Sequence, residues 1–201
     1  MKGFSQKMNF TVFGEPQITW LSPNTNNVEV AGSMIGFNGG LNFDNFFAEN
    51  YAYSTGISIN NINGQLKYKE PGMLDGIDST YTINRGDVTE YHMQYINIPL
   101  GLKFKTIEIG YTKFYAHLGL DANINIKAKA NIPGEENIDV MSELHWYNLG
   151  YYIGGGIEYS IGGSTAIVAG LTYKNGFIDI TRAKDKKVTT GAASLRLGIL
   201  F

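Results

Sequence analysis

The segment Phe114–Ala128 constrains the fold of this chain more than any other part of it. Its even positions are apolar, with Leu120 and Ile126 among them, and its odd positions are mostly polar or small. Successive side chains of a strand point to opposite faces, so a period of two predicts a long strand with one apolar face. No segment of ten or more residues shows the helical periodicity that would compete with this interpretation.

The same alternation recurs seven more times along the 201 residues. The repeats lie at about 10–20, 35–43, 51–59, 91–104, 149–159, 167–173 and 195–201. In one of them the apolar residues are odd-numbered up to Tyr95 and even-numbered from Ile96 onward. This slip of one residue predicts a β-bulge, with Pro99 just beyond it.

The connections between these eight strands alternate between long and short. They run at about 21–33, 44–50, 64–89, 105–112, 129–147, 161–164 and 175–188. Outer-membrane barrels have an even number of strands, long external loops and short periplasmic turns. The pattern predicts one domain over residues 1–201, with both termini in the periplasm.

The type of residue on the polar face shows whether that face points to bulk water or to the interior of the barrel. A soluble, lipocalin-like barrel is the alternative, but its outer face would carry many charges. Here only 17% of residues are charged, against roughly 25% in ordinary soluble domains. The polar face is mostly Gly, Asn, Ser and Thr, which suits the narrow interior of a small barrel. We therefore expect an all-β fold, an eight-stranded antiparallel up-and-down transmembrane β-barrel of a bacterial outer membrane.

The aromatic residues sort by depth in this topology, as interfacial anchoring requires. The predicted periplasmic girdle comprises Phe10, Phe43, Tyr51, Tyr53, Phe104, Phe114, Tyr159 and Phe201. The predicted external girdle comprises Trp20, Phe37, Tyr91, Trp146, Tyr147, Tyr151 and Tyr173.

Several classes of protein and site are not expected. The formal net charge of −2 gives no sign of nucleic-acid binding. No run of about 18 apolar residues predicts a transmembrane helix. The N-terminal lysines are not followed by an apolar run, so we expect no signal peptide in this chain and a processed form if it is exported. Cysteine is absent and the three histidines lack metal-type spacing, so no metal or cofactor is expected.

Three motifs resemble the PorT-like group of small outer-membrane β-barrel proteins of Gram-negative bacteria. They are the strand Tyr95–Lys103 with its Ile-Pro-Leu core, the glycine-rich strand Gly36–Asn42, and the terminal Phe201 after alternating Leu and Ile. The resemblance implies the barrel fold and gives Phe201 the role of an assembly signal. It also implies a connection with protein secretion or with larger outer-membrane complexes, because some members are implicated in these.

Charges of both signs fall on the predicted inner face. An eight-stranded barrel is just wide enough for its side chains to fill, and buried charges are tolerated when paired. We therefore expect a network of ion pairs and hydrogen bonds, with a narrow ion path as the alternative. The expected interior residues are Glu15, Glu90, His92, Lys103, Lys113, His117, Asp121, Glu158 and Arg196, together with Gln17, Lys127 and Lys174.

Two long external loops carry candidate contact residues. The last loop has a basic cluster that would suit the phosphates of lipopolysaccharide, or is simply a solvated loop: Arg182, Lys184, Lys186 and Lys187. The loop 64–89 has apolar residues that predict a partner-binding surface, or alternatively a lid packed on neighbouring loops. They include Tyr68, Met73, Leu74, Ile77 and Tyr81.

The sequence offers little for catalysis. His145 lies near Ser142 and Glu143, which would suit a lipid-modifying enzyme, but neighbouring strand residues face opposite sides and do not form a triad by spacing. We expect a protein that is not an enzyme. It would be a structural scaffold or an accessory subunit of an outer-membrane complex, with external loops that contact protein or lipopolysaccharide. A small channel and a lipid-modifying enzyme are the alternatives.

Overall fold

The computed structural model describes residues 8–77, 79–182 and 187–201. These residues form eleven strands: Met8–Pro23 (β1), Val28–Ala48 (β2), Tyr51–Tyr68 (β3), Gly72–Asp75 (β4), Thr80–Ile83 (β5), Val88–Lys105 (β6), Thr112–Ile132 (β7), Glu135–Asp139 (β8), Tyr147–Gly162 (β9), Thr165–Gly176 (β10) and Val188–Leu200 (β11). Within the described ranges there is no helix long and apolar enough to cross a membrane.

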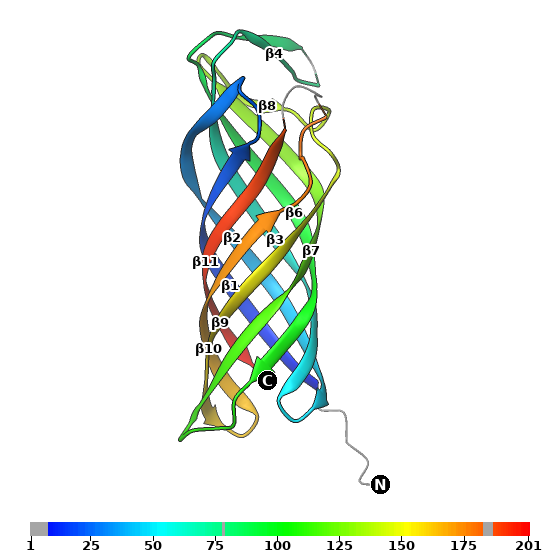
Figure 1. The fold of residues 1–201 in the computed structure, drawn as a ribbon, viewed down its shortest axis with the longest axis vertical. Coiled ribbons are helices and arrows are strands. Elements are labelled where there is room, and N and C mark those ends of the chain that lie inside the picture. Colours follow the sequence, from blue (N-terminus) through cyan, green and yellow to red (C-terminus); the bar gives the residue numbers. More distant parts are fainter. Residues whose placement is uncertain (1–7, 78, 183–186) are drawn as a thin grey trace.

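Eight of these strands close into a barrel (Figure 1). They pair in the order β6-β3-β2-β1-β11-β10-β9-β7, and β6 pairs with β7 to complete the ring. Every one of these pairs is antiparallel. The predicted eight-stranded up-and-down barrel is confirmed. The start of β1 and the end of β11 lie toward the end with the short turns, which in outer-membrane barrels faces the periplasm.

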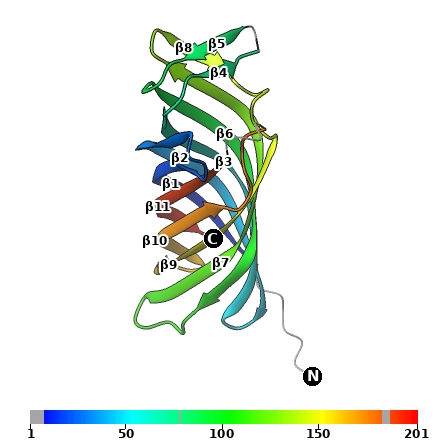
Figure 2. The ribbon, with the colours of Figure 1, turned by 45° about the horizontal axis from the view of Figure 1, so that its top comes forward.

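The remaining three strands lie over the opposite, external end (Figure 2). β4 and β5 form a hairpin, and β8 pairs with the end of β7. We call these three strands, with Ser142–Leu144 and Ile180–Arg182, the cap. One predicted long loop is wrong: the connection expected at 21–33 is a turn of residues 24–27, because β1 runs to Pro23 and β2 begins at Val28.

The lower wall has the polarity of a membrane barrel. Leu120 is 56% exposed and Leu171 is 68% exposed on the outer face, whereas Glu15 and Asn38 are fully buried inside. Aromatic rings contact one another at both the periplasmic and the external end of this wall. The described contacts include Phe10–Phe43 at 5.3 Å, Phe10–Phe201 at 6.2 Å, Trp20–Tyr173 at 6.1 Å and Tyr151–Phe177 at 5.3 Å.

The upper wall has the reverse polarity. Tyr91, Met93 and Tyr95 are buried inside the barrel, where they join an apolar core with residues of the cap. Tyr91 is therefore not part of the external girdle, and the β-bulge predicted within this strand is wrong. β6 keeps its odd residues inside throughout, and it is the apolar set that moves from the inner face to the outer face.

A bulge does exist at this level, but on the neighbouring strand. Gln94 pairs with Lys127 and Tyr95 pairs with Asn125, so β7 holds Ile126 as an extra residue. The bulge turns Ala128 inward, where it is buried, and leaves Lys127 exposed on the outside. The expectation that Lys127 faces the interior is wrong for this reason.

Candidate functional site

A first cluster of charges fills the barrel near the periplasmic end. The Nζ atom of Lys103 lies 2.7 Å from Asp44 Oδ2 and 2.8 Å from Glu158 Oε1. Lys105 Nζ lies 2.6 Å from the other oxygen of Glu158. The Ser54 hydroxyl donates to Asp44 at 2.7 Å. Two carboxylates and two ammonium groups thus balance each other in a space from which water is largely excluded.

A second cluster lies further toward the outside. Arg196 Nε donates to Glu15 Oε1 at 2.6 Å, and Asn38 Nδ2 donates to Glu15 Oε2 at 2.7 Å. Lys174 Nζ lies 3.4 Å from Glu15 and 3.9 Å from Asp121. The fully buried Glu15 carboxylate therefore has two cationic partners and an amide, each from a different strand.

His117 packs between these clusters. Its ring makes T-shaped contacts with Tyr115 and Tyr152, and its Nε2 atom shares a hydrogen bond of 3.2 Å with Thr172. Gly154 lies against the ring, where a Cβ atom would overlap it. The cavities found at this level are small, about 20 Å³ and 10 Å³, which is room for about one water molecule each.

The structure places most, but not all, of the predicted interior residues together. Those in the two clusters or beside them are Glu15, Lys103, His117, Asp121, Glu158 and Arg196, with Gln17 and Lys174. Lys113 lies at the periplasmic rim, paired with Glu108 at 2.9 Å. Glu90 and His92 were expected inside but lie on the outer face, because the odd residues of β6 take the inner one.

Two members of the first cluster, Asp44 and Lys105, were not predicted from the sequence. Asp44 and Lys105 fall in segments expected to be turns, 44–50 and 105–112, whereas β2 continues to Ala48 and β6 includes Lys105 as its last residue. The signal that could have found them is their position in register with strand residues of the same face, Asp44 with Ser54 and Lys105 with Tyr115.

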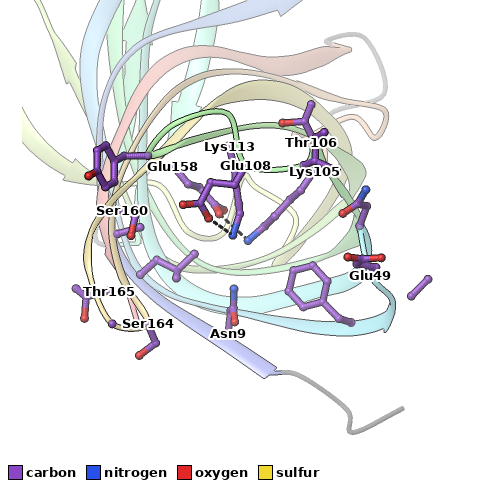
Figure 3. Close-up of a pocket in the computed structure, with 18 residues that line it drawn as sticks. Asn9, Glu49, Lys105, Thr106, Glu108, Lys113, Glu158, Ser160, Ser164 and Thr165 are labelled. Carbon is purple, nitrogen blue, oxygen red and sulfur yellow. Dashed lines mark ion pairs between the residues drawn. The ribbon is translucent and has the colours of Figure 1, made fainter. Parts of the chain in front are cut away.

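The periplasmic mouth holds a cavity of about 450 Å³ (Figure 3). Lys105 and Lys113 point into it, and both ammonium groups are paired with the carboxylates of Glu158 and Glu108. Asn9, Ser160 and Thr165 contribute polar groups to its wall. Glu49 also lines the cavity and takes part in no ion pair of the described residues, so four of its five charged side chains are paired.

A different cavity, of about 290 Å³, opens under the cap, and we call it the cap pocket. Its apolar lining consists of Leu21, Val28, Leu66, Leu144, Ile180 and Val188. Its polar lining includes Asp75, Ser142, Glu143 and Arg182, and the hydroxyl groups of Tyr68 and Tyr91 meet at 2.8 Å in its wall. An apolar cavity with a few polar groups in the mouth of a β-barrel is a common form of binding site.

The cap is held in place by hydrogen bonds between its parts. The backbone N–H of Asp75 donates to Glu143 Oε1 at 2.6 Å, and the Ser142 hydroxyl donates to the carbonyl of Asp75 at 3.1 Å. Ile77 N–H donates to the carbonyl of Asp139 at 3.0 Å. The β4–β5 hairpin and the segment after β8 are thus one structure.

Two of these hydrogen bonds involve Ser142 and Glu143, which the sequence offered with His145 as candidate catalytic residues. Ser142 and Glu143 are directed to the backbone of Asp75, whereas the His145 ring lies 6.1 Å from that of Tyr147. Among the residues that the structure describes, no group of three His, Asp or Glu side chains could hold a metal ion.

The predicted partner-binding residues of the loop 64–89 divide into two groups. Tyr68 and Leu74 are buried in the apolar core, and Tyr81 packs against it, so the expectation that these form an exposed surface is wrong. Met73 and Ile77 are exposed, at 69% and 61%. The apolar residues of this loop act mainly as the core of a lid, because the reversed polarity of the upper wall gives them an apolar surface to cover.

The predicted lipopolysaccharide contacts are only partly described. Arg182 lines the cap pocket, and Lys187 is exposed immediately before β11. Lys184 and Lys186 lie outside the described residues.

Comparisons with known proteins agree with this architecture. The family model for the outer membrane protein beta-barrel domain matches residues 4–187. OprG of Pseudomonas aeruginosa has a similar structure, with a TM-score of 0.51 and 11% identity over 97% of this chain and 95% of that chain.

Two further solved structures are similar at lower TM-scores. Neisserial surface protein A matches with a TM-score of 0.47 and 13% identity over 94% of this chain and 96% of its own. Ail of Yersinia pestis, solved with the heparin analogue sucrose octasulfate, matches with a TM-score of 0.45 and 15% identity over 98% and 99%. No curated protein matches the chain. By the family match over residues 4–187, the chain belongs to the outer membrane protein beta-barrel domain family and is a protein of the bacterial outer membrane.

Proposed function

We propose that this protein is a closed outer-membrane anchor that presents the cap as a binding site for a partner protein, in the manner of a scaffold or accessory subunit. The observation that carries the proposal is the cap pocket, an apolar cavity held open on the external side by a hydrogen-bonded cap. The two charge clusters in the lumen support an anchor rather than a channel, since paired side chains occupy the space that a solute would need.

The make-up of the cap pocket favours a protein partner. Protein interfaces have an apolar centre that takes a large anchor side chain, and a polar rim around it. The pocket has six apolar side chains inside and Asp75, Glu143 and Arg182 at its edge. Met73 and Ile77 add exposed apolar surface on the same cap. The resemblance to PorT-like proteins supports a partner in a secretion system or another outer-membrane complex.

The test is to fill the pocket without removing the cap. Val28→Phe places a larger side chain in the pocket lining, and Val30→Phe makes the same change two residues further along β2, at a half-exposed position outside the pocket. Each variant is purified from native outer membrane in mild detergent, and the co-purifying proteins are quantified by mass spectrometry. We expect Val28→Phe to lose the main partner by about tenfold or more, since anchor pockets dominate interface energies.

A partner retained equally by Val28→Phe and Val30→Phe would overturn the proposal. Exchange of residues 70–86 for a short Gly/Ser turn is a weaker test. It would remove Leu74 and Ile83 from the apolar core and expose the pocket.

A further inference from the structure

A groove of about 400 Å³ runs along the outer wall of the barrel, and we call it the outer groove. It is formed by residues of β2, β3, β6 and β7, among them Ile35, Phe37, Asn63, His92, Lys127 and Lys129. One wall is apolar, since Ile35 is 82% exposed at an irregular part of the β2–β3 pairing. The other walls carry amides, an imidazole and two ammonium groups. The outer groove and the cap pocket have no lining residue in common.

The outer groove lies where the lipid-facing surface ends. The apolar band of an outer-membrane barrel is about 25 Å tall, and a strand tilted by about 40° needs roughly ten residues to cross it. Counted from Phe114 at the periplasmic girdle, this band reaches Ile124, and Ile126 marks its upper edge. Lys127 and Lys129 follow directly, at the depth of the lipid headgroups.

The external aromatic girdle is interrupted at the same place. On β1, β9 and β10 the boundary is marked by Trp20, Tyr151 and Tyr173, whose rings contact one another in pairs. On β3 and β6 the corresponding outer positions include Asn63 and His92. Amides and cations thus replace the usual aromatic anchors on β3, β6 and β7, whereas β2 keeps the half-exposed Phe37 in the groove.

The polar side chains of the groove are arranged by the strand register. His92 pairs with Lys129, and Gln94 pairs with Lys127, so all four stand on neighbouring outer positions. Gln94 Nε2 donates to Asn61 Oδ1 at 2.9 Å, which links the β6 side of the groove to β3.

The acids near the groove do not neutralise its lysines. Glu90 lies 3.8 Å from His92 Nε2, and Asp139 is the β8 residue in register with Lys129. Lys129 Nζ donates to Asn137 Oδ1 at 3.0 Å. Among the ion pairs of the described residues, none includes Lys127 or Lys129. The ammonium group of Lys127 therefore has no carboxylate partner among the described residues, and that of Lys129 has an amide partner but no carboxylate partner.

We propose that the outer groove binds the phosphate group of an outer-leaflet glycolipid, with Lys127 and Lys129 on the phosphate and Ile35 and Phe37 against the first methylenes of its acyl chains. Ammonium groups are good phosphate partners, and basic residues at a membrane surface attract anionic lipids. An apolar wall next to the cations fits an amphiphile, because a free anion would gain nothing from it. This site is independent of the partner protein proposed for the cap.

The experiment measures lipid binding by native mass spectrometry of the intact protein. Diphosphorylated lipid A, its monophosphorylated form and its dephosphorylated form are titrated against wild type and the double variant K127Q/K129Q. We expect the affinity of wild type for the diphosphorylated form to fall by about tenfold in K127Q/K129Q, and to fall in wild type as phosphates are removed. The variant K127R/K129R, which keeps both charges, should bind like wild type.

The control is the double variant K67Q/K69Q. These two lysines also lie in the upper part of the molecule but contact Glu29, at 3.8 Å and 3.3 Å. Migration of unboiled samples on a denaturing gel checks that each barrel is folded. Equal affinity of wild type and K127Q/K129Q overturns the proposal, as does an equal loss in K67Q/K69Q. Displacement of the lipid by millimolar inorganic phosphate alone would also overturn the assignment to a glycolipid.

Discussion

Glu15 shows how much of this fold depends on single buried charges. Its carboxylate is fully buried and contacts Arg196, Lys174 and Asn38. Removing one partner from a buried ion pair leaves the other charge uncompensated, which costs more than the pair itself contributes. Glu15 therefore matters for the stability of the barrel because its removal would leave the buried charges of Arg196 and Lys174 without their counter-charge.

We expect Glu15→Gln to lower the free energy of unfolding by roughly 3–5 kcal/mol, because Arg196 and Lys174 lose their shared counter-charge. Urea unfolding of the refolded barrel in lipid vesicles, followed by tryptophan fluorescence, measures this. Glu29→Gln is the matched control, since Glu29 is half exposed with Lys67 and Lys69 and should cost less than about 1 kcal/mol. Similar small losses at both positions would contradict the role given to Glu15.

A second pair of substitutions tests the two faces of β7. Leu120 is on the lipid-facing side, and Leu120→Arg should cost roughly 2–4 kcal/mol near the bilayer midplane. Asn123 is on the inner side and accepts a hydrogen bond from Asn97 at 3.0 Å, so Asn123→Ser should cost about 1 kcal/mol. The same unfolding measurement applies, and equal losses would mean that the faces are assigned backwards.

At the scale of elements, β6 shows what an alternating pattern can and cannot predict. The period of two established that Tyr91–Phe104 is a strand with two unlike faces, and that prediction is confirmed. The same period does not say which face is inside. In the lower half the inner face is polar, whereas in the upper half Tyr91 and Met93 make it apolar, so the reversal looked like a slip of one residue.

The interior clusters show a second limit. Glu15, Lys103 and Arg196 were predictable because they occupy the polar positions of a clear alternation. Asp44 and Lys105 were not, because they lie just beyond the alternating segments 35–43 and 91–104. The pairing of particular residues depends on register, which alternation does not fix. Alternation places Tyr91 on the outer face, so it cannot show that the loop 64–89 covers an apolar core inside the barrel.

We expect the β4–β5 hairpin to open locally while the barrel stays folded. Leu74 is fully buried, and Leu74→Ala should loosen the cap by roughly 2–5 kcal/mol, because it removes methyl groups from the apolar core. Hydrogen exchange should then speed up at Gly76 and Ile77, whose amides bond within the cap. Met73→Ala, the adjacent exposed position, is the control and should change little. Equal exchange in both variants would show that the hairpin is not anchored by Leu74.

At the scale of the whole molecule, the barrel has two compartments separated by its charge clusters. The periplasmic mouth and the cap pocket hold about 450 Å³ and 290 Å³, whereas the cavities between them hold about 20 Å³ and 10 Å³. Wide channels belong to barrels with many more strands. The distribution of space favours binding at the ends over passage through the middle.

We therefore expect no discrete conductance steps from the purified protein in planar lipid bilayers. The reason is that hydrogen-bonded and ion-paired side chains fill the lumen at the level of Glu15 and Lys103. A preparation that is folded, as judged by the different gel migration of boiled and unboiled samples, is the necessary control. Reproducible single-channel steps from such a preparation would contradict the closed-anchor proposal and favour the channel.

The continuity of the strands from the lower wall into the upper wall has a mechanical consequence. β2, β3, β6 and β7 carry their ladders past the lipid boundary, with Val28 paired to Tyr68, Lys67 to Val88, and Glu90 to Asn131. A tether pulling outward on this wall would load these ladders along the strands, so that many hydrogen bonds would have to slide together before any strand moved. The four strands are continuous through the boundary, although the β2–β3 pairing is irregular between Ser33 and Phe37 and the β6–β7 pairing has a bulge at Gln94 and Tyr95. A force on the upper wall is therefore transmitted to the whole barrel, where the burial of the lipid-facing surface in the bilayer resists it.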